Sequence, residues 1–368
     1  MEAKEHFHGS DLEKIAEYYQ IAPETIIKFG ANVNPLGIST TVKEKLIQNL
    51  DIISSYPDRD YLSLKKAISA YCGASPDHIA VGNGSTELIS LLISQRHPKK
   101  ALVLGPTYSE YERELGLSGG TISYYNLKEP CDFVLDMQDL RDNLPDGTEL
   151  IILCNPNNPT SSALSCQDIE VLLKASKERG IFVMIDETYV EFAPDISEIT
   201  AVPLTDVYDN LMVIRGVSKF YAAPGLRFGY GITSNEAFLQ ALLTHQNPWS
   251  LNSIGAFAGE LMLKDTDYFQ RTRSLICSER DRLYKILLQM PGVKVYKPYG
   301  NFILVRLLKP GISSFDMFEA AIKKHMMIRD CSSFESLQGE YIRFCIMLPE
   351  DNDRLMKCIR DCIGDGVK

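Results

Sequence analysis

The sequence lacks the features that mark membrane, secreted and nucleic-acid-binding proteins. No apolar stretch reaches the roughly 18 residues that a membrane helix needs, and the polar start, MEAKEHFHGSDLEK, lacks the apolar core of a signal peptide. No Lys/Arg-rich run occurs, and 38 basic against 48 acidic residues give a net charge of −10. This balance disfavours nucleic acid and anionic membranes as partners, so we expect a cytoplasmic protein.

The cysteines and glycines do not form the patterns that mark disulfide-rich, metal-binding or dinucleotide-binding proteins. The nine cysteines are scattered, their number is odd and none form a CxxC pair, so we expect neither a disulfide framework nor a metal site. No G-x-G-x-x-G motif follows an early strand, which argues against a dinucleotide-binding enzyme.

Short apolar segments alternate with amphipathic segments through most of the chain. The apolar segments are rich in β-forming residues, end in turn or polar residues and cover 101–106, 149–156, 180–187 and 211–218. Helical patterns such as 86–95, 165–179 and 235–245 lie between or beside them. Near-continuous apolar strands separated by helices indicate an α/β fold with a mostly parallel central sheet flanked by helices.

The pattern differs in the last third of the chain. Helices are expected at 271–289, 315–325 and 352–363, and strands at 293–296, 301–306 and 341–346. A chain of 368 residues is also long for a single hydrophobic core. We therefore predict an N-terminal segment over 1–40 that packs at the active site, a large domain over 41–255 and a smaller α+β domain over 256–368.

Polar side chains follow three of the predicted strands at the point where each strand ends. Asn158 follows the second strand, Asp186 ends the third with Tyr189 one turn on, and Lys219 follows the fourth with Arg227 eight residues later. Because ligands in open α/β sheets sit at the carboxyl ends of the strands, we expect these five side chains to converge.

The chemistry of this set fits one cofactor. Lys219 can form an imine with an aldehyde once its pKa is lowered. A protonated pyridine nitrogen would pair with the Asp186 carboxylate, which is otherwise costly at the end of an apolar strand. Arg227 offers a fork for a phosphate, and Asn158 and Tyr189 could bind a phenolate oxygen. These groups together describe pyridoxal 5′-phosphate (PLP).

Two further segments could complete the cofactor site. The turn at Gly84, Ser85 and Thr86 opens a helix and offers N–H groups and hydroxyls to a phosphate, but it could also simply cap that helix. Tyr108 follows another strand and could stack on the ring of the cofactor, or it could belong to the core.

Three stretches resemble the fold-type I PLP enzymes of the aspartate aminotransferase superfamily in order and spacing: N-P-N-N-P-T, D-E-T-Y and S-K-F-Y-A-A-P-G-L-R. The resemblance covers essentially the whole chain. It implies that Lys219 holds PLP as a Schiff base, that Asp186 binds the pyridine nitrogen and that Tyr189 is the third catalytic residue. The cofactor-binding residues that it implies are Gly84, Ser85, Thr86, Tyr108, Asn158, Asp186, Tyr189, Ser218, Lys219 and Arg227.

Within that superfamily the chain is similar to the histidinol-phosphate aminotransferase branch, and particularly to the threonine-phosphate decarboxylases of cobalamin biosynthesis. The similar stretches are His8-Gly9, 29–37, Tyr56-Pro57-Asp58 and 248–252. The resemblance implies a homodimer in which Tyr56 reaches the cofactor phosphate of the neighbouring subunit. It also implies that Arg343 binds the substrate α-carboxylate and Arg329 the substrate phosphate, with His8 and Asn34 in the same pocket.

The resemblance leaves two activities open. The first is decarboxylation of O-phospho-L-threonine, or of O-phospho-L-serine, to an amino-alcohol phosphate. The alternative is transamination of histidinol phosphate with 2-oxoglutarate. A non-catalytic PLP-binding protein is disfavoured because the set of Lys219, Asp186 and Arg227 is intact. The sequence departs from the family pattern at Ser161, where Gly is common, and at Gly216, where Ser or Thr is usual.

Overall fold

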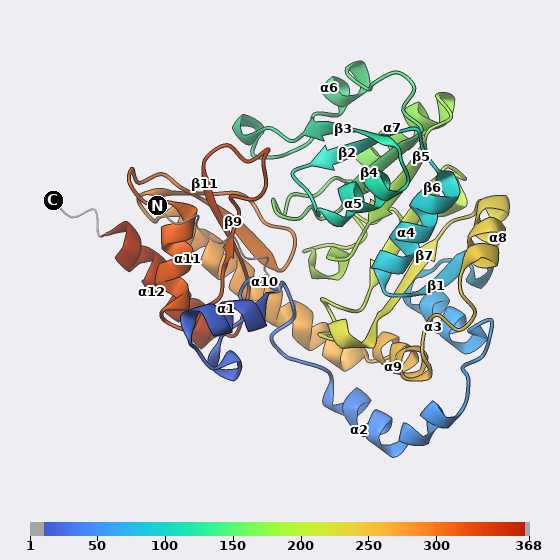
Figure 1. Cartoon of the computed structure of the whole chain (residues 1–368), viewed down its shortest axis with the longest axis horizontal. Helices are drawn as coiled ribbons and strands as arrows, with labels where there is room; N and C mark the ends of the chain where they lie inside the picture. The colour runs from blue at the N-terminus through green and yellow to red at the C-terminus, as the bar shows by residue number, and fades with distance from the viewer. Residues whose placement is uncertain (1–10, 365–368) are drawn as a thin grey trace.

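The computed structural model describes residues 11–364, which form two β-sheets with helices packed around them (Figure 1). The larger sheet has the strand order β1-β7-β6-β5-β4-β2-β3. Its strands are β1 (Ile79–Asn83), β2 (Lys100–Gly105), β3 (Thr121–Asn126), β4 (Leu150–Cys154), β5 (Phe182–Asp186), β6 (Leu211–Gly216) and β7 (Phe228–Ile232). Strands β2 to β6 pair in parallel, and β4 and β5 are buried along their whole length. The predicted fold class is confirmed.

Strand β7 is the exception in this sheet, because it pairs antiparallel with both β1 and β6. The sequence pattern does not reveal it, since Gly229 and Gly231 interrupt the apolar run and weaken the strand signal. Gly229 is required here because a Cβ atom at this position would lie 2.4 Å from the backbone nitrogen of Ser85. The close approach seats the start of the helix after β1 directly against the sheet.

Eight helices belong to the part of the chain that carries the larger sheet, and several of them connect its strands. They are α2 (Thr40–Gln48), α3 (Leu62–Cys72), α4 (Ser85–Arg96), α5 (Glu110–Leu117), α6 (Met137–Asp142), α7 (Cys166–Glu178), α8 (Glu236–His245) and α9 (Ser253–Leu263). Helix α4 packs on β1, β6 and β7, whereas α7 packs on β5. Ser165 begins α7 with a capping box that includes Asp168, which agrees with the helix predicted for this segment.

The smaller sheet is antiparallel, with the order β10-β11-β9-β8. Its elements are α10 (Thr266–Leu288), β8 (Val293–Val295), β9 (Phe302–Leu307), α11 (Ser314–Ile322), β10 (Arg329–Asp330), β11 (Glu340–Cys345) and α12 (Pro349–Ile363). The N-terminal helix α1 (Leu12–Tyr19) lies beside α11, where Tyr19 contacts Phe318. The domain boundaries at 40 and 255 remain a prediction.

The part of the chain that the structure describes contains no helix long and apolar enough to cross a membrane. Its His, Cys, Asp and Glu side chains do not gather in threes at a potential metal site. All nine cysteines are free.

Candidate active site

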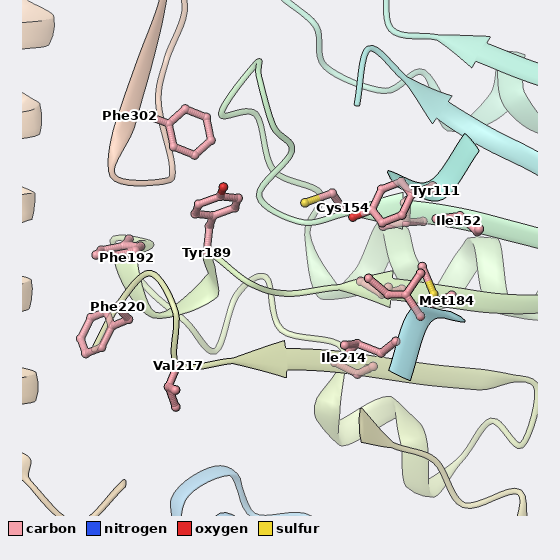
Figure 2. Packing of buried hydrophobic residues seen from close by; sticks show 14 of the residues in the cluster. Tyr111, Ile152, Cys154, Met184, Tyr189, Phe192, Ile214, Val217, Phe220 and Phe302 are labelled. Carbon is pink, nitrogen blue, oxygen red and sulfur yellow. The ribbon is translucent and has the colours of Figure 1, made fainter. Parts of the chain in front are cut away.

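A cavity of about 1070 Å³ lies at the carboxyl ends of the parallel strands and is lined by residues from both sheets. The predicted site residues that line it are Ser85, Thr86, Tyr108, Asn158, Asp186, Tyr189, Ser218, Lys219, Arg227, Arg329 and Arg343. Behind the cavity, the strands are packed with apolar side chains such as Ile152, Met184 and Ile214, whereas Tyr189 lies beyond the strand ends near Phe302 (Figure 2).

Lys219 follows β6 and presents its amine to the cavity. Its Nζ donates a hydrogen bond to the carbonyl oxygen of Ala31, at 3.0 Å. The pKa of Lys219 is lowered to about 8, first by burial and then by the nearby charges of Arg343 and Arg227, while Asp186 opposes this shift. An amine with such a pKa is partly neutral near pH 7 and can act as a nucleophile.

Asp186 ends β5 with both carboxylate oxygens engaged. Its Oδ1 accepts from the Thr188 backbone nitrogen at 2.9 Å and from the Thr188 hydroxyl at 2.5 Å, and its Oδ2 accepts from the Tyr111 hydroxyl at 2.6 Å. Burial raises the pKa of Asp186, whereas the bonds from Thr188 and Tyr111 and the charge of Lys219 lower it. The carboxylate is therefore held by neutral donors and has no ion-pair partner among the described residues.

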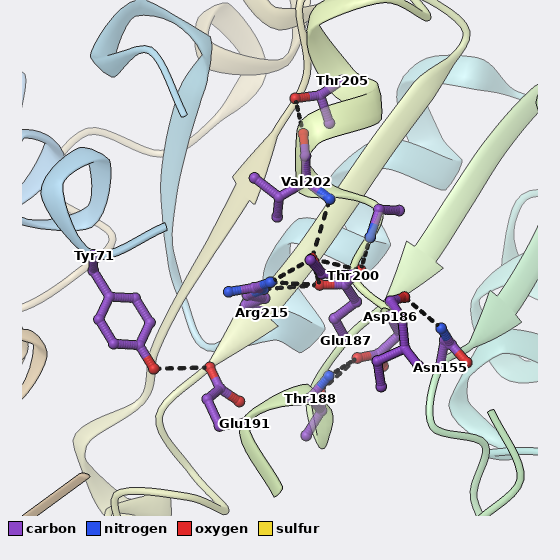
Figure 3. A network of polar contacts seen from close by, with 12 residues as sticks. Tyr71, Asn155, Asp186, Glu187, Thr188, Glu191, Thr200, Val202, Thr205 and Arg215 are labelled. Atoms are coloured by element: carbon purple, nitrogen blue, oxygen red, sulfur yellow. Dashed lines mark hydrogen bonds and ion pairs between the residues drawn. The ribbon is translucent and has the colours of Figure 1, made fainter. Parts of the chain in front are cut away.

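The next residue, Glu187, has a different environment, because successive side chains of a strand point to opposite faces. Arg215 donates to Glu187 Oε2 from Nε at 2.9 Å and from Nη2 at 2.7 Å, and the Ala201 nitrogen donates to Oε1 at 2.6 Å. Figure 3 shows this network, with Thr200 bridging the two charged groups. Of the two acids in the D-E-T-Y stretch, only Asp186 lines the cavity.

Two arginines form the wall on the side of the smaller sheet. Arg329 and Arg343 face each other across the β10–β11 pair, so their side chains share one face of the sheet. Arg343 donates from Nη1 to Asn158 Oδ1 and from Nη2 to the Gly30 carbonyl at 2.8 Å, while its buried Nε has no partner within residues 11–364. Arg329 donates from Nη2 to the Ser333 hydroxyl at 2.6 Å.

The opposite end of the cavity combines a helix start with a cation. Ser85 and Thr86 begin α4, where free N–H groups and the helix dipole favour an anion. Gly84 does not line the cavity, but it lies against Arg227, because a Cβ atom at Gly84 would lie 2.4 Å from Arg227 Nη2. Gly84 also has φ +81°, a backbone conformation that favours glycine.

The two departures from the family pattern have different consequences. A Cβ atom at Gly216 would meet no atom closer than 3.5 Å, so its missing hydroxyl is not imposed by crowding. Ser161 adopts the left-handed backbone, with φ +60°, that the sequence pattern expects of a glycine. Its hydroxyl accepts a hydrogen bond from the Gly300 nitrogen at 2.9 Å, and its carbonyl accepts one from the Tyr299 nitrogen at 2.8 Å.

The side chain of Asn34 does not line the cavity, so its place in the substrate pocket stays a prediction. Its Nδ2 lies within bonding distance of the Phe220 carbonyl at 2.8 Å and of two buried hydroxyls, which is a structural role. Asn32 lines the cavity instead, donates from Nδ2 to the Tyr189 hydroxyl at 3.3 Å and has no partner for Oδ1 in the described chain. Both asparagines belong to the segment that resembles the family, and only tertiary packing distinguishes them.

Tyr56 and His8 are the remaining predicted site residues. Tyr56 is 80% exposed and packs on Trp249, with 4.7 Å between the ring centroids. It therefore cannot reach this cavity within its own chain, and its contact with a second subunit stays a prediction. His8 lies outside the described residues.

The sequence model of the family described as aminotransferase class I and II matches residues 24–359. The chain belongs to this family. Aminotransferases of class I and II and their relatives depend on PLP, so the protein is a PLP-dependent enzyme.

Relatives from this family carry two different names. The chain is 33% identical over 356 residues to the threonine-phosphate decarboxylase of Salmonella typhimurium, covering 97% of this chain and 96% of the relative. It is 30% identical over 366 residues to the histidinol-phosphate aminotransferase of Methanococcus aeolicus, covering 99% and 97%. The crystal structure of the histidinol-phosphate aminotransferase from Clostridium acetobutylicum superposes with a TM-score of 0.84 at 31% identity, covering 91% of this chain and 98% of that one.

The cavity of this member of the class I and II family fits PLP in its chemistry. Asp186 is a buried carboxylate without a cationic partner among residues 11–364, which suits a pyridinium nitrogen. Arg227 packs directly on Gly84, the residue before α4, where a Cβ atom would lie 2.4 Å from its Nη2. The guanidinium is therefore next to the N-terminus of α4, and this pairing suits a phosphate. The Lys219 amine, with its lowered pKa, suits an aldehyde.

Proposed function

We propose that the protein decarboxylates O-phospho-L-threonine, with O-phospho-L-serine as a close substitute. In this reaction the bond between Cα and the carboxylate breaks, CO2 leaves, and a proton takes its place on Cα, giving an amino-alcohol phosphate. The observation that carries the proposal is the pair of buried arginines, Arg329 and Arg343, opposite the Lys219 side of the cavity. Two adjacent cations suit a substrate that has both a carboxylate and a phosphate.

The residues around the cofactor have the following proposed roles. Lys219 would hold the PLP aldehyde and would carry the proton that the substrate Cα exchanges. Asp186 would keep the pyridine nitrogen protonated, and Asn158 and Tyr189 would bind the ring hydroxyl. When bound, PLP would supply the electron sink for the bond that breaks at Cα.

Of the residues that line the cavity, Ser85, Thr86 and Arg227 would bind the cofactor phosphate, Ser218 would support that end, and Tyr108 would stack on the ring.

The wall of arginines decides which Cα bond is presented. Arg343 has one buried N–H group, Nε, without a partner among the described residues, so it can bind a carboxylate without giving up its bond to Gly30. Arg329 is proposed to bind the substrate phosphate and to fix the rotation about the Cα–N bond. With both anions held, the carboxylate can be kept perpendicular to the cofactor ring.

Histidinol-phosphate aminotransferase remains the second candidate, because relatives with that name match nearly the whole chain. Histidinol phosphate has no α-carboxylate, so Arg343 would then serve 2-oxoglutarate. The same residues support both reactions, and only the reaction products separate them.

The deciding experiment incubates the purified holoenzyme with O-phospho-L-threonine and measures released CO2. The expected result is CO2 together with an equal amount of aminopropanol phosphate. Absence of CO2, together with glutamate formed from histidinol phosphate and 2-oxoglutarate, would reject the decarboxylase. Arg329→Gln should raise the KM for phosphothreonine strongly, and Arg306→Gln, which changes another arginine of the same cavity, is the matched control.

We also propose that the active form is a homodimer with shared sites. Tyr56 and Trp249 are exposed aromatic side chains beside a second, smaller cavity that Tyr56 lines. In the dimer, Tyr56 would donate to the phosphate of PLP in the partner subunit. Tyr56→Phe should weaken PLP binding without changing the molar mass in light scattering; a monomeric wild-type holoenzyme would contradict the proposal.

A further inference from the structure

Tyr111 is the residue of the cavity that the sequence patterns did not single out and that contacts Asp186 directly. It lies in the first turn of α5, has no exposed surface, and places its hydroxyl 2.6 Å from Asp186 Oδ2. Figure 2 shows its ring next to Cys154 at the end of β4. Its ring also packs edge-on against Tyr108, with 5.6 Å between the centroids and an interplanar angle of 87°.

The hydrogen bonds of Asp186 leave room for one more donor. A carboxylate offers about four lone-pair positions. The Thr188 backbone nitrogen and hydroxyl occupy Oδ1, and the Tyr111 hydroxyl occupies one position of Oδ2. The free position is on Oδ2, the oxygen that Tyr111 orients.

The groups that face Asp186 come from several elements. Tyr111 on α5 and Thr188 after β5 donate hydrogen bonds to the carboxylate. The charge of Lys219, after β6, lowers the pKa of Asp186. The charge of Asp186 in turn raises the pKa of Cys154 on β4 and of Tyr108 before α5. Burial raises the pKa of Tyr111 well above its ordinary value, so the phenol stays protonated and donates throughout the working pH range. Lys219 is the one of these groups that can be positively charged, and it also titrates.

We propose that Tyr111 is a positioning residue, whose hydroxyl holds the Asp186 carboxylate ionised and turned so that one lone pair of Oδ2 meets the PLP ring nitrogen. The inference rests on the proposed role of Asp186 as the partner of that nitrogen. Loss of the hydroxyl leaves the buried carboxylate with fewer donors, which favours its protonated form. A protonated Asp186 cannot pair with a pyridinium, so the change should show in cofactor binding at the acidic end of the pH range.

The experiment measures the Kd of PLP by absorbance titration of the apoprotein across pH, for the wild type and four variants. Tyr111→Phe keeps the ring and removes the hydroxyl. Tyr125→Phe is the matched control, since Tyr125 also donates to a carboxylate at 2.6 Å, that of Asp139, and does not line the cavity. Asp186→Asn and the double variant Asp186→Asn/Tyr111→Phe test whether Tyr111 acts through Asp186.

The expected result is a PLP-binding midpoint that moves to higher pH in Tyr111→Phe and stays in place in Tyr125→Phe. On the acidic side, the Kd of Tyr111→Phe should rise on the order of tenfold above that of the wild type. In the Asp186→Asn background the same substitution should have no pH-dependent effect. If Tyr111 only fills space, Tyr111→Phe keeps the ring and should leave the midpoint where it is in the wild type.

Failure of the inference and failure of the proposed function give different results. If Asp186→Asn weakens PLP binding and Tyr111→Phe leaves the midpoint unchanged, the role of Tyr111 is wrong and that of Asp186 stands. If Asp186→Asn binds PLP as the wild type does, the proposed role of Asp186 is itself wrong. Should Tyr111→Phe fail to fold, Thr188→Val removes a hydroxyl donor from the other oxygen and must move the midpoint in the same direction.

Discussion

The lowered pKa of Lys219 makes a quantitative prediction about how fast the apoprotein captures its cofactor. With a pKa of about 8, roughly a tenth of the Lys219 amine is neutral at pH 7. At the ordinary value of 10.5, only about 0.03% would be neutral, so the reactive fraction is about 300 times larger. Because only the neutral amine attacks an aldehyde, this ratio sets the expected rate advantage.

The perturbation is Arg343→Gln, which removes the charge that lowers the pKa of Lys219 most after burial itself. The pKa of Lys219 should rise, and bond formation with PLP at pH 7 should slow on the order of threefold to tenfold. Arg306→Gln removes an arginine of the same cavity that does not contribute to this shift, and should leave the rate unchanged.

The assay mixes apoprotein with excess PLP at a series of pH values and follows the violet-blue absorption band of the attached cofactor by stopped flow. Borohydride trapping and peptide mapping confirm that Lys219 is the modified residue. The rate should rise with pH and level off just above pH 8 in the wild type, and at higher pH in Arg343→Gln. A wild-type rate that still climbs beyond pH 10, or two superimposable profiles, would refute the electrostatic reasoning.

Further predictions concern turnover and stability. Lys219→Ala should abolish turnover in the CO2 assay while PLP still binds without a covalent bond, and substantial residual activity would exclude Lys219 as the catalytic amine. Glu187→Gln removes the carboxylate that forms the ion pair with the buried Arg215, so the urea unfolding midpoint should fall by an amount equivalent to about 3–5 kcal/mol; a change below 1 kcal/mol would contradict this account. Ser161→Ala leaves the Gly300 nitrogen without its acceptor and keeps the left-handed backbone, so it should cost about 1–3 kcal/mol. Ser161→Gly loses the same bond but relaxes the backbone, and should unfold at a midpoint between those of the wild type and Ser161→Ala.

The strand ends of the larger sheet could be predicted because burial on both faces produces continuous apolar runs that stop where the chain reaches the cavity. Asp186 and Lys219 stand at such stops, and their position in sequence therefore implies their position in space. Strand β7 gives no such run, since the approach of α4 requires Gly229 in its middle. A strand in which glycines allow a helix to approach lacks the run of apolar side chains that would reveal it.

The residues that support the catalytic groups could not be predicted in the same way. Tyr111 is 75 positions away from Asp186 in sequence, and nothing in a helical tyrosine indicates which acid it will meet. Asn32 and Asn34 are separated by one residue, yet the first lines the cavity and the second ties Phe220 to the N-terminal segment. Tertiary packing alone makes these choices, so they follow only from the structure.

The bond between Arg343 and Asn158 has a consequence for which side chain position 158 can accept. Under the proposed roles, Asn158 meets a cation of the substrate wall through its oxygen and a phenolate of the cofactor through its nitrogen. A primary amide can do both because it is neutral, with an oxygen that accepts and a nitrogen that donates. An aspartate of the same size would grip the guanidinium more firmly and repel the phenolate, so a one-atom exchange would uncouple the two ligands that the enzyme must hold at once.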